Sequence, residues 1–303
     1  MNRAGQAGKR LREASGLSIR GGTNISRNQG DTVANLSISR AWDETKGILA
    51  RDGKLFVAVA AALILLPQVV AALFTGQGPQ AETGGLFWGV LVFAATIIAL
   101  IGQLAMVRLA LSSGLSVGES IRHGLSRFLP FILAAILMVT GILLLFLLVM
   151  IVLAVAGVVS MDPAAAQMPP RDVAIIALVL IVPLFYLAVR LLPMVAIASA
   201  EPIGPIAILK RSWALTRGHF GRLLGFLLLF LVAAIILVVA VSIIIGLVVN
   251  LALGNPEPFS FAALVLALLL GIVQTAVTVV YIVMVARIYS QLAGEVTVPS
   301  SGT

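Results

Sequence analysis

Cysteine is absent from the chain, and histidine occurs only twice among its 303 residues. The lack of cysteine excludes disulfides, thiolate metal sites and a cysteine nucleophile. The two histidines, His123 and His219, have no partner at the spacing that metal ligands need, and no phosphate-binding loop or nucleophile motif is present. We expect Glu119, four residues before His123, to form a solvated ion pair with it. The sequence therefore predicts no enzyme activity, catalytic residue, metal or cofactor.

Charged residues are also scarce, at 11% of the chain, whereas about a quarter of a soluble globular domain is charged. Hydrophobic residues make up 60%, and the mean hydropathy is +1.13. These values predict an integral membrane protein. The formal net charge of +8 does not indicate nucleic-acid binding, because the bases lie beside apolar runs rather than on one polar domain.

Six apolar runs are long enough to cross a membrane, which takes about 20 helical residues. They cover residues 55–74, 86–107, 131–159, 173–189, 223–249 and 259–286. The fourth run is short, and we expect it to extend through Arg190, because long basic side chains reach the interface from within the membrane. The predicted fold is all-α, with six transmembrane helices.

The two ends of the chain have a different composition from this membrane domain, which we place at residues 37–292. Residues 1–36 are rich in glycine, arginine, asparagine and serine, and we expect them and residues 293–303 to be disordered tails. A valine codon is a common bacterial start, so we hypothesise that translation begins at Val33.

Three basic segments precede apolar runs, and we call them elbows. In residues 37–51 the apolar positions follow helical spacing and form one stripe, made up of Ile38, Ala41, Trp42, Thr45, Ile48 and Leu49. In residues 204–222, Gly204 and Pro205 are suited to begin a helix and Gly218 to end it. A weaker third elbow, residues 116–128, has its own stripe, made up of Val117, Ile121, Leu125 and Phe128. We predict amphipathic surface helices at all three.

Lysine and arginine lie almost entirely on one side of the six runs. The connectors at residues 75–85, 160–172 and 250–258 contain a single base, Arg171. By the positive-inside rule, the elbows and both termini face the cytoplasm. The predicted location is the inner (plasma) membrane of a bacterium.

The elbows divide the chain into three similar units. Each unit has an elbow, a helix out, a short turn and a helix back, and it ends on an arginine between aliphatic residues, at Arg108, Arg190 and Arg287. Such internal repeats are common in membrane proteins. We therefore predict three repeated helical hairpins joined by elbow helices on the cytoplasmic side.

Two of the elbows resemble a known family, the bacterial membrane domain named after glycerophosphoryl diester phosphodiesterases. The matching residues are Arg211-Ser212-Trp213-x-x-Thr216-Arg217-Gly218-x-Phe220 and their echo in residues 40–47. The resemblance covers roughly residues 36–292 and implies a multi-helix membrane module, which in some proteins is fused to a cytoplasmic phosphodiesterase. The catalytic half, with its paired histidines and metal-binding carboxylates, has no counterpart in this sequence. The resemblance therefore implies neither phosphodiesterase activity nor any site residue.

The basic elbows are candidates for binding anionic lipid headgroups. The candidate residues are Arg40, Trp42, Lys46, Lys210, Arg211, Trp213, Arg217 and Arg222. A simpler interpretation is that the charges set the topology and the tryptophans anchor the elbows. We predict a non-catalytic membrane protein that scaffolds a partner or interacts with phospholipid, with the bilayer, and anionic phospholipid in particular, as its partner.

The alternative function is a transporter or channel for a small or amphipathic solute. Gln274 and Thr278 form a polar strip near the middle of the last run and are the best candidates to line a cavity. Hydrogen bonds between helices would explain these residues without transport. No acidic residue, lysine or histidine lies deep in any run, which argues against an ion-coupled carrier.

Overall fold

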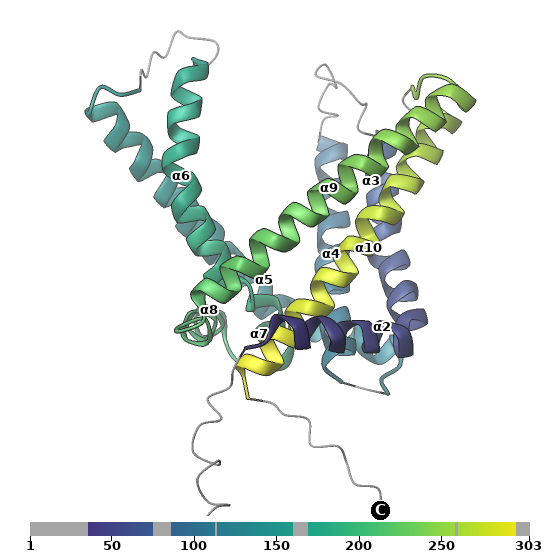
Figure 1. Cartoon of the computed structure of the whole chain (residues 1–303), viewed down its shortest axis with the longest axis horizontal. Helices are drawn as coiled ribbons and strands as arrows, with labels where there is room; N and C mark the ends of the chain where they lie inside the picture. The colour runs from purple at the N-terminus through teal and green to yellow at the C-terminus, as the bar shows by residue number, and fades with distance from the viewer. Residues whose placement is uncertain (1–35, 75–85, 113, 160–168, 258–259, 295–303) are drawn as a thin grey trace, which may run out of the picture. The chain divides into compact units, whose positions relative to one another are not determined.

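The computed structural model describes residues 36–74, 86–112, 114–159, 169–257 and 260–294, and every regular element in them is helical (Figure 1). In chain order the elements are α2 Ile38–Ala60, the π-helix η1 Ala61–Leu65, α3 Leu66–Phe74, α4 Leu86–Leu111, α5 Val117–Val155, α6 Pro170–Leu191, α7 Met194–Ala200, α8 Pro205–Leu215, α9 Phe220–Leu253 and α10 Phe261–Leu292. The predicted tails and Val33 lie outside the described residues, apart from Leu36, Ala293 and Gly294.

Six helical stretches within the described residues are long and apolar enough to cross a membrane. They are Ile38–Ala72, Gly89–Leu111, Val117–Val155, Pro170–Ala200, Phe220–Leu253 and Phe261–Leu292. This confirms the predicted all-helical fold with six potential membrane spans. Large apolar side chains are exposed along α5, α6 and α9, for example Leu143, Leu178 and Leu229. Apolar surface of this extent is typical of a protein that is solvated by lipid.

Two of the predicted elbows are parts of longer helices. Residues 37–51 lie largely in the first half of α2, and residues 116–128 largely in the first part of α5, which continues past Pro130. Only the elbow predicted at residues 204–222 forms a separate helix, α8. Figure 1 shows α2 lying across α10 before the chain turns toward α3. The predicted stripe in residues 116–128 is partly wrong, since Leu125 is exposed and Gly124 faces inward.

Serine residues cap the N-termini of α2, α5 and α10. The Ser37 hydroxyl accepts a hydrogen bond from Arg40 N, and Ser260 caps α10 in the same way. At α5, Ser116 and Glu119 form a capping box, in which each side chain bonds the backbone of the other residue. Glu119 therefore does not pair with His123, whose Nε2 lies 2.7 Å from the carbonyl oxygen of Ser199. The predicted Glu119–His123 pair is wrong, because the cap uses the carboxylate.

A π-helical turn interrupts the first membrane span at Ala61–Leu65. Pro67 lies just beyond it and has no N–H to donate. The ring of a proline also crowds the carbonyl four residues earlier, and a wider turn relieves that crowding. Pro67 thus accounts for the irregularity without ending the helix.

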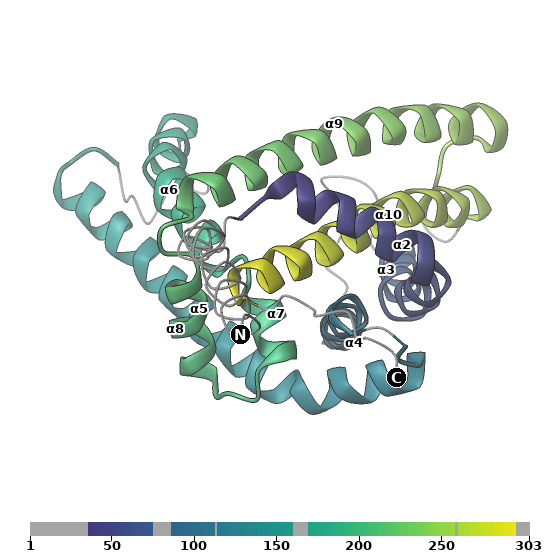
Figure 2. The same ribbon diagram turned by 60° about the horizontal axis from the view of Figure 1, so that its bottom comes forward.

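The main core lies where α2, α4, α5, α7, α8 and α10 meet. Its fully buried members include Phe56, Leu104, Met106, Ile197 and Tyr289. The helix α7 was not predicted from the sequence; its seven residues follow Pro193, which separates them from α6. The Ser199 hydroxyl donates to the Leu104 carbonyl at 3.1 Å, so α7 is bonded to α4. Figure 2 shows α7 close to α5 and to the C-terminal end of α10.

Candidate functional site

The helix α8 and the residues just after it carry most of the predicted headgroup ligands. The helix begins as predicted, with Gly204 as N-cap and Pro205 in the first turn, and Gly218, at φ +81°, follows its end. Ile208 and Ser212 are buried against the core. Lys210 is exposed and lies three residues before Trp213, which is half-buried, so the two share a face of the helix.

Arg190, at the end of α6, is surrounded by aromatic rings. Its guanidinium carbon lies 5.1 Å from the centroids of Tyr186 and Trp213 and 5.7 Å from that of Phe220. These distances are within the range of cation–π attraction. The rings also contact one another, with Tyr186 and Trp213 packed edge to face at 5.6 Å. The stacking fixes the position of a charge that arginine never loses.

In the part of the chain that the structure describes, this guanidinium has no acidic partner. Its Nη1 lies 3.3 Å from the Thr216 hydroxyl, and its backbone carbonyl accepts from Ser212 at 2.7 Å. Within the described residues Arg190 forms no ion pair, and its Nε is buried without a hydrogen-bond partner. A fixed, uncompensated guanidinium beside a tryptophan is suited to bind a phosphate group. We call Arg190, Lys210, Trp213 and Arg217 the α8 site.

The other bases near α8 differ in their contacts. Arg211 Nε lies 3.1 Å from Glu201 Oε1, and the same oxygen accepts from the Tyr289 hydroxyl. Arg222 Nη1 donates to the Leu36 carbonyl at 3.3 Å. Lys210 and Arg217 are exposed and, in the part of the chain that the structure describes, form no ion pair. Of the predicted headgroup ligands near α8, Lys210 and Arg217 are therefore the best placed to meet an external anion.

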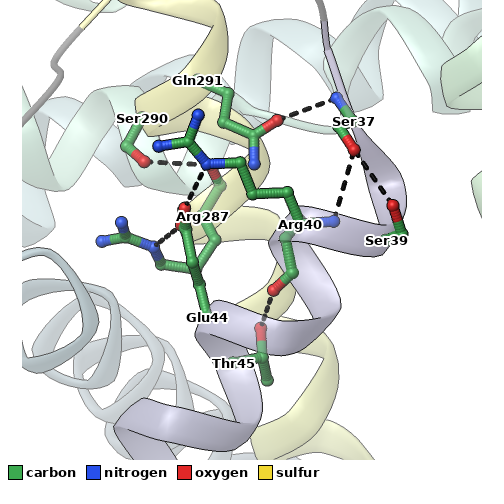
Figure 3. Close-up of polar contacts among 9 residues, drawn as sticks. Ser37, Ser39, Arg40, Glu44, Thr45, Arg287, Ser290 and Gln291 are labelled. Carbon is green, nitrogen blue, oxygen red and sulfur yellow. Dashed lines mark hydrogen bonds and ion pairs between the residues drawn. The ribbon is translucent and has the colours of Figure 1, made fainter.

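The remaining predicted headgroup ligands, Arg40, Trp42 and Lys46, lie on α2. There Glu44 accepts hydrogen bonds from two arginines (Figure 3). Its two oxygens accept from Arg40 Nε at 2.8 Å and from Arg287 Nε at 2.7 Å. Next to them, the Gln291 side chain accepts from Ser37 N at 3.0 Å. These bonds attach the start of α2 to the end of α10, so Arg40 has a structural partner.

Trp42 and Lys46 lie on another side of α2. Lys46 pairs with Asp43 at 2.8 Å, and its Nζ lies 6.0 Å from the centre of the Trp42 ring. The Trp42 side chain is 44% exposed although it belongs to the predicted apolar stripe. The remaining stripe residues are buried or half-buried, as predicted. Trp42 therefore presents an indole to the surroundings of the protein.

An apolar groove of about 880 Å³ lies beside this indole, between α9 and α10. Its lining comes from the start of α2 (Ile38, Ser39 and Trp42), from α9 between Phe226 and Val241, and from α10 between Ile272 and Met284. Gln274 and Thr278 are not among its lining residues, and the Thr278 hydroxyl donates to the Gln274 carbonyl within the helix. The polar strip predicted for a solute path thus lies outside this groove.

The described residues contain no cluster of side chains that could bind a metal ion. No group of three or more histidine, cysteine or acidic residues is placed to hold a metal ion there. His219 is the N-cap residue of α9, and its buried Nδ1 has no partner among the described residues.

Sequence reasoning missed the central residue of the α8 site. Arg190 was noted only as the end of the fourth apolar run and of a repeated unit, although Tyr186, one turn earlier, and Trp213 were both visible in the sequence. An arginine that follows an aromatic residue by four positions is a signal for stacking on a helix. The sequence alone does not show that Trp213 packs on Arg190, because that contact depends on how α6 and α8 pack together.

Comparison with known proteins gives one family match, over most of the chain. A model of a domain of unknown function (DUF7847) matches residues 36–292. No curated protein and no solved structure matches the chain. The matched region contains α2 to α10 and every residue of the α8 site and of the groove. Because the match covers well over half of its residues, the chain belongs to the DUF7847 family.

Proposed function

We propose that this chain is a multi-pass protein of a bacterial inner membrane, with its six spans arranged as three hairpins. In this topology both termini, α8 and the first part of α2 lie at the cytoplasmic surface. The census of lysine and arginine supports the orientation. The sequence of the elbows supports a relationship to the membrane domain named after glycerophosphoryl diester phosphodiesterases.

Its function in this proposal is non-catalytic and consists of binding anionic phospholipid at the α8 site. The observation that carries the proposal is Arg190, whose guanidinium is held by three rings and has no carboxylate partner in the described residues. Arginine matches the geometry of a phosphate group, and tryptophan prefers the level of the headgroups. A lipid phosphate would supply the missing counter-charge.

Lys210 and Arg217 would add attraction for the headgroup. Bases near an anionic surface contribute about 1 kcal/mol each. Neither residue has an ion pair to lose in the described structure, so binding a lipid breaks no existing contact. Together they would give the site a preference for anionic over zwitterionic lipid.

Neutralising these two bases tests the proposal. In the double variant Lys210→Gln with Arg217→Gln, we expect the preference for phosphatidylglycerol over phosphatidylcholine to fall about 30-fold, since roughly 2 kcal/mol of attraction is lost. Native mass spectrometry of the full chain, equilibrated with an equal mixture of the two lipids, measures the ratio of bound species.

The matched control is Lys54→Gln with Arg122→Gln, which removes the same charge from two other exposed bases. We expect this control to keep the preference. Equal losses in both double variants would mean that only total charge matters, and the α8 site would be rejected. No preference in the unaltered chain would reject the function itself.

A further inference from the structure

The groove between α9 and α10 has the dimensions of a binding site for a lipid chain. Its lining on α9 runs from Phe226 to Val241, which corresponds to roughly 22 Å of helix at about 1.5 Å per residue. One leaflet of a bilayer has a hydrocarbon depth of about 15 Å, half of the whole core. The groove is therefore long enough to hold an acyl chain that descends through one leaflet.

The two helices pack against each other near both ends of the groove. At one end Phe230 contacts Tyr281, with ring centroids 5.3 Å apart, in the cluster that contains Phe226 and Met284. At the other end Val249 packs with Ala262 and Leu266. Between these ends, short side chains leave the space open, at Ala233, Ala234 and Ala276.

The lining of the groove suits a hydrocarbon chain. Apart from Ser39, the lining residues on α2, α9 and α10 are apolar. Within the hydrocarbon core of a bilayer, acyl chains are the solvent for such surfaces. A lipid acyl chain is therefore the occupant that matches this lining.

Positive charge surrounds the end of the groove that Trp42 lines. Arg222 lies one turn before Phe226 on α9 and bonds the Leu36 carbonyl, next to the start of α2. Arg40 follows Ser39, and Arg287 follows Met284 by three residues, with Glu44 between the two arginines (Figure 3). Three guanidinium groups therefore lie near this end of the groove. An anionic headgroup above the groove would be attracted to this end.

We propose that the groove binds one acyl chain of an anionic glycerophospholipid, whose phosphate lies beside Trp42 and Arg222. The inference rests on the proposed phospholipid function, but its site is formed by residues other than the α8 site. The Trp42 ring lies between the apolar lining and the charged end of the groove. An indole is apolar with one polar N–H, so it suits the level at which an acyl chain meets its headgroup.

Photo-crosslinking tests the proposal directly. The full chain is reconstituted in phosphatidylcholine vesicles that contain phosphatidylglycerol with a diazirine on one acyl chain, and crosslinked residues are mapped by mass spectrometry. We expect crosslinks to concentrate on groove residues such as Leu237 and Ala276, above the level at Leu178 and Val182, which are exposed on α6. A phosphatidylcholine probe with the same chain should crosslink the groove less.

A bulky side chain that fills the groove should abolish the excess of crosslinks at groove residues. In Ala276→Phe we expect groove crosslinks to fall to the level found on α6, while Ala177→Phe, the same change at an exposed position of α6, should leave them unchanged. Ala234→Leu is a smaller change for the same purpose, should Ala276→Phe fail to fold. The proposed acyl-chain site would be overturned if crosslinks were spread evenly over the apolar surface. It would also be overturned if groove crosslinks were unchanged in a variant that fills the groove and still folds. Equal crosslinking by the two probes would overturn it as well.

The variant Lys210→Gln with Arg217→Gln separates this inference from the proposed function. We expect it to retain the groove crosslinks, because those residues are not part of the groove lining. If its headgroup preference falls and the groove crosslinks of the unaltered chain are absent, the α8 site stands and the groove is wrong. If neither the preference nor the crosslinks are found in the unaltered chain, both are wrong.

Discussion

Replacing Gly124 with alanine is expected to destabilise the protein by about 1–3 kcal/mol, the usual cost of forcing an extra methyl group into a packed interface. A Cβ at Gly124 would lie 2.7 Å from the Ile101 carbonyl oxygen and 3.2 Å from Ala105 N, both backbone atoms of α4. Neither atom can move aside alone, so α4 and α5 would have to separate. Small residues commonly permit such close approach in membranes. The measurement is the thermal midpoint of the purified protein in detergent.

Gly141 provides the matched control on the same helix. Nothing lies within 4 Å of a Cβ built there. Alanine is the better helix former by up to about 1 kcal/mol, so we expect Gly141→Ala to leave the midpoint unchanged or raise it. If Gly124→Ala behaved like Gly141→Ala, the close packing of α4 on α5 would be wrong.

Glu44→Gln is the second substitution with a large expected effect. The Glu44 carboxylate bonds Arg40 and Arg287, and the side chains of Arg287 and Glu44 are only 14% and 23% exposed. Its loss leaves two guanidinium groups facing each other across a neutral amide. We expect a cost of about 2 kcal/mol, in the range of a lost charge-assisted hydrogen bond that is partly buried. High salt should reduce the cost by screening the remaining repulsion.

Asp43→Asn is the control for this change. Asp43 pairs with Lys46, but these two side chains are 70% and 57% exposed, and such surface pairs contribute about 0–1 kcal/mol. In the double variant Glu44→Gln with Arg287→Gln, part of the loss should be recovered, because one of the opposed charges is gone. Equal effects of Asp43→Asn and Glu44→Gln on the thermal midpoint would contradict the attachment of α2 to α10 through Glu44.

The spans and the start of α8 were predictable because each depends on local sequence. Long apolar runs fix the existence of the membrane helices, and Gly204 with Pro205 fixes where α8 begins. The cap of α5 was also visible, since Ser116 and Glu119 have the spacing of a capping box, but Glu119 was assigned to His123 instead. Local rules thus predicted the helices better than the partners of their polar residues.

The candidate sites depend on contacts between distant segments. Arg190 meets Trp213 only because α6 and α8 pack together, and Trp42 lines the groove only because α2 lies beside α9 and α10. A periodic stripe states which face of a helix is apolar, but it does not name the neighbour. For Trp42, the stripe predicted a place on the apolar face of a surface helix but not the groove that its ring lines. Gln274 and Thr278 share one face of α10, but the sequence did not show that this face is not the one that lines the groove.

The central claim is that the bases of α8 lie on the cytoplasmic side and the turn between α9 and α10 lies on the other. The absence of cysteine makes single-cysteine variants unambiguous, and Ala214 on α8 and Asn255 after α9 are both exposed. Applied to intact spheroplasts, a membrane-impermeant maleimide should label Asn255→Cys and leave Ala214→Cys unlabelled until the membrane is opened. Labelling of Ala214→Cys in intact spheroplasts, with Asn255→Cys protected, would contradict the topology and the lipid sites that depend on it.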